Sequence, residues 1–307
     1  MIDRRKEITP MIKHLTTRQV AMALGVSDAS LKRWCDKGLI PTIRTVGGHR
    51  RLPVSGVIQY LLKSGHPLLR PDLLGMPPAT ATSNLAIERC RKLMLRALLE
   101  GDEESFRRVG LNLFMAGMKA RDIFDKALSP ILLDLEQSFA QGRIKPYQQM
   151  RMVQMIERWI GELRLSLQRP AETASLAIGC GMHGERLLGV TTAMMDVSLR
   201  EIGWRTESLG CEAPLGSLSE LLRDLRPRLF WLAVGQVSAP PSFVKQYDTL
   251  AATAEETGVA LVVAGHELTR EIRQQMRYAA FCDTLGHLVG FARTLRGGSV
   301  APTPVGA

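Results

Sequence analysis

Residues 16–51, TTRQVAMALGVSDASLKRWCDKGLIPTIRTVGGHRR, constrain the fold more than any other stretch of the chain. Thr16, with Gln19 three residues later, is typical of a capping box that begins a helix. Ser27 is a favourable N-cap for a second helix, and a glycine follows each of the two helical stretches. Two short helices joined by a few residues that include glycine predict a helix-turn-helix.

A β-hairpin is predicted directly after these helices. Residues 43–52 are predicted to form a β-hairpin that turns at Gly47 and Gly48, a pair suited to a tight turn. Three cationic or imidazole side chains follow on the returning strand: His49, Arg50 and Arg51. A helix-turn-helix beside a cationic hairpin is a winged helix, which suits duplex DNA.

The second helix is expected to lie in the major groove, where Lys32 and Arg33 reach phosphates or base edges. The wing glycines let the backbone approach the sugar-phosphate chain, and the arginines beside them supply charge. We predict these DNA-contacting residues: Thr17, Arg18, Ser27, Ser30, Lys32, Arg33, Arg44, Gly47, Gly48, His49, Arg50 and Arg51.

Three residues of this segment have a second interpretation. Trp34 either packs between helices or stacks on a base, and the packing interpretation is favoured. Lys37 either contacts DNA or complements the negative end of its helix. His49 either contacts DNA or is only a turn residue.

The segment resembles the DNA-binding domain of the MerR superfamily. The residues that carry the resemblance follow the pattern V-S-x-x-[ST]-L-x-x-W and the run G-G-H-R-R: Val26, Ser27, Ser30, Leu31, Trp34 and Gly47 to Arg51. The charge is consistent with it, since residues 1–63 hold 12 Lys and Arg against 4 Asp and Glu, a net +8 of the chain's +10.

The composition of the 307-residue chain, 45% hydrophobic and 23% charged, predicts an ordinary globular protein of several domains. Five scattered cysteines predict neither a disulfide framework nor a structural zinc site. The sequence shows no signal peptide and no apolar run of membrane-spanning length, so we expect a cytoplasmic protein.

The remaining sequence predicts four further segments. Residues 1–66 hold the winged helix, closed by a helix over 54–63, and residues 67–84 have the composition of a linker. Residues 85–170 have helical periodicity over 85–99, 103–118, 120–141 and 147–167, which predicts a four-helix bundle. Residues 171–298 alternate strands with helices, and 299–307 are expected to be a disordered tail.

The alternating segment predicts a flavodoxin-like (Rossmann-like), doubly wound α/β domain, so that the whole chain is an α+β multidomain protein. The predicted strands are 175–179, 204–209, 229–234, 260–263 and 281–284. The predicted helices are 185–202, one capped by Ser217 that ends at Arg226, one from Ser242 to Glu256, 267–279 and 287–295.

This domain order resembles the CarA/CarH/LitR group of MerR-type repressors, whose last two domains bind cobalamin and sense light. Local similarities at the back of the chain are Gly184-Glu185-Arg186, Gly203-Trp204, Leu209-Gly210 and Ala264-Gly265. The resemblance implies a cobalamin pocket with cofactor-contacting positions at Phe139, Met150, His183, Leu188 and Gly265.

The residues at these positions depart from the family's pattern. The family's cobalt-ligating histidine corresponds to Leu187 or Leu188, while His183 lies out of register. The family's W-x9-E-H motif is replaced by Phe139 and Gln149-Met150, and its Ser-x-Leu by residues 235–237, GQV. Because imidazole ligation needs an imidazole, we expect a degenerate pocket with no metal.

The sequence contains no enzyme motif such as G-x-G-x-x-G, a P-loop, G-x-S-x-G or H-E-x-x-H. We therefore predict a non-enzymatic, sequence-specific regulator that binds a double-stranded operator as a homo-oligomer, independently of light and cobalamin. A cobalamin-responsive regulator with His183 or His266 as a displaced ligand is the alternative. A cobalamin-dependent enzyme or methyl-carrier subunit is a third class.

Overall fold

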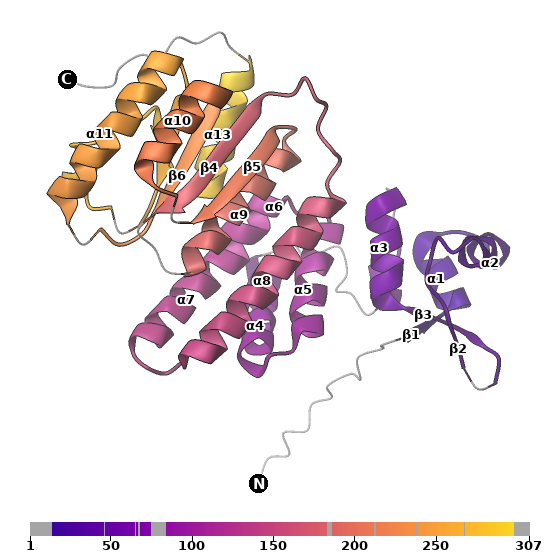
Figure 1. Ribbon diagram of the computed structural model, residues 1–307. Coiled ribbons are helices and arrows are strands. Elements are labelled where there is room, and N and C mark those ends of the chain that lie inside the picture. Colours follow the sequence, from indigo (N-terminus) through magenta and orange to yellow (C-terminus); the bar gives the residue numbers. More distant parts are fainter. Residues whose placement is uncertain are drawn as a thin grey trace. The chain divides into compact units, whose positions relative to one another are not determined.

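The computed structural model describes residues 14–45, 47–64, 66, 68–74, 84–182, 186–211, 213–237, 239–266 and 268–297. The chain divides into two compact units, residues 1–87 with 108–117, and residues 88–107 with 118–307 (Figure 1). His183 and the predicted tail 299–307 lie outside the described residues.

The first unit contains the predicted helix-turn-helix. Helix α1 (Thr17–Leu24) begins with the capping box, in which the Gln19 amide donates to Thr16 Oγ1 at 3.1 Å. It ends at Gly25, whose φ of 64° lies in the left-handed region that favours glycine. Helix α2 (Asp28–Asp36) is capped by Ser27, as predicted, which accepts from the Ser30 amide at 3.1 Å.

A small antiparallel sheet completes the winged helix. The predicted hairpin is β2 (Ile43–Arg44) and β3 (Arg50–Pro53), and helix α3 (Val54–Ser64) follows it. A third strand that was not predicted, β1 (His14–Thr16), pairs with β3, so that the strand order is β1-β3-β2. Leu15 of β1 lies opposite Leu52 of β3, and both are fully buried.

Part of the predicted linker packs on the helix-turn-helix. The amides of Leu69 and Arg70 donate to the Ala23 carbonyl at 2.9 and 3.0 Å. The 3-10 turn η1 (Pro71–Leu74) contacts α1, and Leu74 is buried. Although residues 67–84 have the composition of a linker, they include apolar residues, and these allow the segment to pack on α1.

The predicted helical stretches are helical. They are α4 (Asn84–Glu100), α5 (Glu103–Met115), the succession α6 (Ala120–Ile123), π-helical η3 (Phe124–Leu128) and α7 (Ser129–Ala140), and α8 (Pro146–Ser166). Trp159 of α8 is buried and makes edge-to-face contacts with Phe106 and Phe124, with ring centroids 5.5 and 5.9 Å away. Such aromatic pairs add to the stabilisation from burial alone.

The second unit also contains a five-stranded parallel sheet. Its strands are β4 (Leu176–Met182), β5 (Arg205–Cys211), β6 (Leu229–Val234), β7 (Ala260–Ala264) and β8 (Ala280–Phe281). Their order, β5-β4-β6-β7-β8, is that of a flavodoxin-like doubly wound fold, as predicted.

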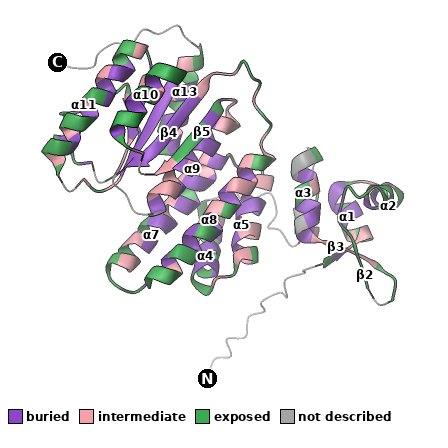
Figure 2. Cartoon of the chain, viewed as in Figure 1, coloured by how far each residue is buried: buried purple, intermediate pink, exposed green. Residues whose placement is uncertain are grey.

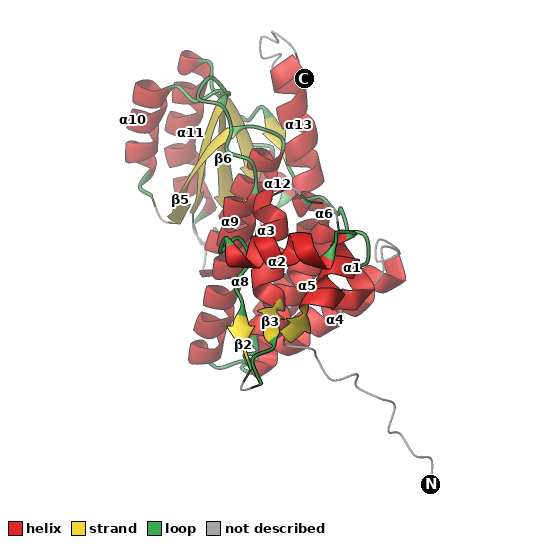
Figure 3. Ribbon diagram, turned by 90° about the vertical axis from the view of Figure 1, so that its right-hand side faces the viewer, coloured by secondary structure: helices red, strands yellow, loops and turns green. Residues whose placement is uncertain are grey.

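Helices cover both faces of this sheet. Helices α10 (Leu215–Leu225) and α11 (Pro240–Thr257) lie on one face, and α9 (Arg186–Glu201) and α13 (Leu285–Gly297) lie on the other (Figure 3). The strands β4 and β6 are buried almost throughout (Figure 2). On the α9 face the Trp231 indole fills the space above Gly179, and its Nε1 donates to Thr192 Oγ1 at 2.8 Å.

Three helix predictions in this unit were wrong. Ser217 and Ser242 are not caps, because Pro214 at the N-cap of α10 and Pro240-Pro241 at the start of α11 begin those helices earlier. The predicted helix 267–279 is only the short α12 (Arg270–Arg273). Beyond it, the Tyr247 hydroxyl donates to the Arg277 carbonyl at 2.6 Å, and the chain turns back to form β8.

Two carboxylates join the helical segment of this unit to its sheet. Asp125, in η3, accepts from the amides of Leu285 and Gly286 at the start of α13, both at 2.9 Å. Glu201, at the end of α9, accepts from the Ala120 amide at the start of α6 with both oxygens at 3.1 Å. Burial raises the pKa of the Glu201 carboxyl, although the Ala120 hydrogen bond favours its charged form.

We predict that Asp125→Ala lowers the free energy of unfolding by about 1–2 kcal/mol, as expected when a helix N-terminus loses its acceptor and its favourable charge. Asp125→Asn keeps one acceptor oxygen and should lose less. Urea titration monitored by circular dichroism measures both. A loss below about 0.5 kcal/mol for the alanine variant, the range of an ordinary surface change, would contradict this role.

Candidate nucleic-acid interface and the sheet edge

The exposed face of α2 presents the two cations predicted to enter the major groove. Lys32 and Arg33 are both exposed. The Lys32 ammonium lies 2.8 Å from the Asp28 carboxylate one turn earlier, and this hydrogen bond lowers the pKa of Asp28. Lys32 therefore has an acidic partner within the helix, and a DNA phosphate or base must compete with it.

The wing turn is organised by a residue that the sequence analysis did not single out. Thr45 Oγ1 accepts from the His49 amide at 3.2 Å, and the Thr45 carbonyl accepts from the Gly48 amide at 2.8 Å. Gly48 has a φ of 76°, which explains the need for glycine. Gly47, Gly48 and His49 are exposed at the tip, as a DNA-contacting turn requires.

Arg50 and Arg51 have different surroundings. The Arg50 guanidinium lies 2.5 Å from the Asp36 carboxylate and 3.4 Å from the Lys32 carbonyl, so it joins the wing to the end of α2. Because side chains alternate along a strand, Arg51 lies on the opposite face of β3 from the buried Leu52. Arg51 is therefore better placed than Arg50 to meet a ligand from outside.

The other predicted DNA-contacting residues are at or near the surface of the first unit. Arg18, Ser27 and Arg44 are exposed, and Thr17 and Ser30 are half-buried. Trp34 supports the packing interpretation, because its ring lies 5.1 Å from that of Tyr60 in α3 and 5.4 Å from that of His66.

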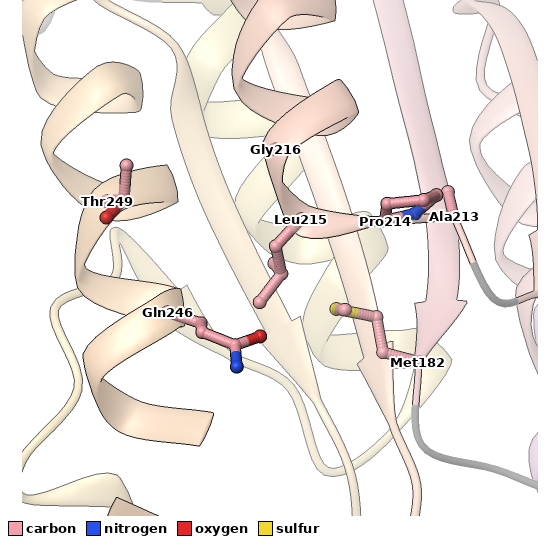
Figure 4. Close-up of a pocket in the computed structure, with 7 residues that line it drawn as sticks. All are labelled: Met182, Ala213, Pro214, Leu215, Gly216, Gln246 and Thr249. Carbon is pink, nitrogen blue, oxygen red and sulfur yellow. The ribbon is translucent and has the colours of Figure 1, made fainter. Parts of the chain in front are cut away.

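In the second unit, a cavity of about 640 Å³ lies beside the carboxyl end of β4. It is lined by Met182, Ala213, Pro214, Leu215, Gly216, Gln246 and Thr249. Figure 4 shows the side chains of Met182, Leu215 and Gln246 directed towards the same space. None of these seven residues is charged or carries an imidazole or a thiol, so the lining provides none of the carboxylate, imidazole or thiolate groups that usually hold a transition metal.

The position that the resemblance assigns to a cobalt ligand is filled by aliphatic packing. Leu187 is buried, and Leu188 lies so close above Gly181 that a Cβ built there would be 2.9 Å from the leucine side chain. The same Cβ would lie 3.1 Å from Cys211 Sγ, and one built on Gly189 would lie 3.6 Å from Glu157 Oε1. Among the described residues, this corner offers an aliphatic group, a thiol and a carboxylate.

The remaining predicted cofactor positions do not assemble a ligand set. Phe139 is half-buried in α7, and Met150 on α8 is 44% exposed. Gly265 follows β7 where a Cβ would clash with the Val234 carbonyl at 2.4 Å, so it serves close backbone packing. His266 is exposed, and its Nε2 lies 3.6 Å from Glu136 Oε2.

These observations do not fit a histidine-ligated corrinoid at the position that the resemblance implies. No group of three or more His, Cys, Asp or Glu side chains capable of holding a metal occurs in the part of the chain that the structure describes. A ligand that entered between α9 and the sheet would also have to displace Trp231 and its hydrogen bond to Thr192.

Comparisons with known proteins agree with the two folds. Residues 15–64 match the sequence model of a helix-turn-helix domain. No curated protein matches the chain. None of the helices in the described ranges is long and apolar enough to cross a membrane.

Three solved structures are similar to this chain. The monomethylamine corrinoid protein of Methanosarcina barkeri has a TM-score of 0.51 at 17% identity, covering 66% of this chain and 96% of its own. A cobalamin-binding protein from Desulfitobacterium hafniense DCB-2 has a TM-score of 0.34 at 16% identity, covering 66% and 96%. The methanol:cobalamin methyltransferase complex MtaBC from Methanosarcina barkeri has a TM-score of 0.35 at 13% identity, covering 90% and 95%. At these identities the first likeness establishes the fold of two thirds of the chain and not its ligand.

We predict that Arg51→Ala weakens all duplexes alike and lowers the log–log salt slope by about 0.9, the loss of one phosphate contact. Arg33→Ala should instead change sequence preference, since a good base contact is worth about 1–3 kcal/mol of discrimination. Fluorescence anisotropy with duplexes selected from a random pool measures both effects.

Asp36→Ala separates the two roles of Arg50. If Arg50 positions the wing through Asp36, this variant should weaken binding about as much as Arg50→Ala, although it removes a negative charge. Tighter binding by Asp36→Ala would contradict the positioning role and would make Arg50 a direct phosphate contact, as the sequence analysis predicted.

Proposed function

We propose that the protein is a sequence-specific DNA-binding transcriptional regulator, and specifically a repressor that binds a double-stranded operator as a homo-oligomer in the cytoplasm. The observation that carries the proposal is the capped helix-turn-helix with a cationic wing. It presents Arg33 on α2 and Arg44 and Arg51 on the wing, within a segment that matches a helix-turn-helix domain. The direction of regulation rests on the resemblance to the CarA/CarH/LitR repressors.

The second unit, in this proposal, is a degenerate cobalamin-binding-like module that serves assembly and acts independently of cobalamin and light. What supports the loss of the cofactor is the aliphatic packing of Leu187 and Leu188 at the ligand position and the exposed Met150. A thioether is a soft, weak ligand and does not replace an oriented imidazole. No catalytic role is proposed.

A cobalamin-responsive regulator is the second candidate, and one observation favours it. His266 stands beside Glu136 just beyond the carboxyl end of β7. A carboxylate next to an imidazole is the usual arrangement that orients a metal-ligating histidine. His183, the other displaced ligand, lies outside the described residues.

We predict that assembly depends on residues 85–298. One winged helix buries little DNA surface, and such modules usually bind paired half-sites as dimers. Removing residues 85–307 should leave a folded monomer whose operator affinity is lower by about 10²-fold or more, the usual gain from bivalent attachment. Analytical ultracentrifugation and anisotropy measure these properties, with circular dichroism as the control for folding. A truncated dimer of full affinity would contradict the proposal.

A further inference from the structure

Four arginines converge on a second cavity, at the amino-terminal edge of the parallel sheet. The cavity has a volume of about 410 Å³ and lies at the opposite end of the strands from that shown in Figure 4. Its lining residues come from the end of α8, the loop after it, the end of α9 and the start of β5: Arg164, Leu165, Arg169, Pro170, Glu172, Arg200 and Arg205.

Two of the guanidinium groups are held in place by other parts of the fold. Arg164 Nε donates to Asp196 Oδ2 at 2.7 Å, and its Nη2 donates to the Thr206 carbonyl at 3.2 Å. Arg205 Nη1 donates to the Glu172 carbonyl at 3.2 Å. Preorganised guanidiniums lose little side-chain freedom when a ligand arrives, which favours binding.

The cavity has a surplus of positive charge. Four guanidiniums are accompanied by the carboxylates of Glu172 and the buried Asp196. Arg200 Nε is buried, and no described group accepts a hydrogen bond from it. Burial lowers the pKa of Arg200, and the positive charges of Arg164 and Arg169 lower it further, while Asp196 raises it.

We propose that this cavity binds the phosphate group of a small molecule. Its residues are different from the predicted DNA-contacting residues and from those that line the cavity at the carboxyl edge of the sheet. Guanidinium groups match the oxygen geometry of phosphate. A multiply charged anion also balances the surplus positive charge of the cavity better than a ligand with a single carboxylate would. Leu165 and Pro170 supply apolar surface for the organic part of such a ligand. A small molecule fits better than a duplex because Arg200 lies partly buried within the cavity.

The test is isothermal titration of the full-length protein with inorganic phosphate and with pyrophosphate, at constant ionic strength. Arg169→Gln and Arg205→Gln remove exposed members of the cluster without leaving the Asp196 carboxylate unpaired. Arg293→Gln, an exposed arginine of α13 outside the lining, is the matched control. We expect saturable binding of pyrophosphate at one site per chain, weakened about tenfold or more by each cluster variant and unchanged by the control.

Two results would overturn the proposal. The first is the absence of saturable binding of either anion, or binding that the cluster variants do not weaken. The second is a loss of duplex affinity and salt slope in an Arg169→Gln/Arg205→Gln variant that still binds pyrophosphate like the wild type. That outcome would make the cluster a DNA contact. Because the titration uses no DNA, the phosphate site and the DNA-binding proposal can fail independently.

Discussion

The packing of the second unit's helical segment against its α/β part depends on two carboxylates. Each carboxylate lies in one of these parts and accepts hydrogen bonds from the first amides of a helix in the other part. Asp125 caps α13 from the helical segment, and Glu201 caps α6 from the end of α9. Each carboxylate lies at the positive end of a helix dipole. The carboxylate and the first helical amides thereby supply each other with hydrogen-bond partners that neither would otherwise have within its own helix. Asp125 lies in the π-helical turn η3, from which its carboxylate reaches the first amides of α13.

The carboxyl and amino edges of the sheet differ in the side chains that line them. At the carboxyl edge, where doubly wound folds usually bind ligands, the described side chains are mainly apolar, and Leu188 closes the space above Gly181. At the amino edge, Arg164 is fixed by Asp196 and three more arginines surround the cavity. A likeness in fold to a corrinoid protein therefore does not determine which ligand this chain holds, or at which edge of the sheet.

The sequence predicted the parts of the structure that depend on neighbouring residues. The capping box of Thr16 and the cap of Ser27 are interactions over three residues, and the parallel strands are continuous apolar runs, so local patterns indicated both. Strand β1 was missed because its three residues form a pattern only when paired with β3. The helix predicted beyond Arg273 failed because Tyr247, distant in the sequence, binds the Arg277 carbonyl.

The candidate sites, like the fold, were predictable only where neighbouring residues form a pattern. The cationic residues of the wing could be named from GGHRR, but their roles could not be separated, since the contact between Arg50 and Asp36 joins residues 14 positions apart. The arginine cavity gave no sequence signal because its members lie on two helices, a loop and a strand. Departures from the motifs of the resemblance, by contrast, can be found directly in the sequence, and the structure adds that Leu188 packs closely over Gly181 at one of these positions.

The most direct test of a cobalamin-independent DNA-binding regulator is a gel shift of the full-length protein on a selected duplex. The shift is measured in darkness and under green light, each with and without adenosylcobalamin. We predict the same sequence-specific retardation in all four conditions, because in our proposal the winged helix binds DNA and the position expected to ligate cobalt holds Leu187 or Leu188 in place of an imidazole. Absence of specific binding would contradict the assignment of a DNA-binding regulator. A change with light or cofactor would contradict the proposed loss of cobalamin binding and favour ligation by His266 or His183.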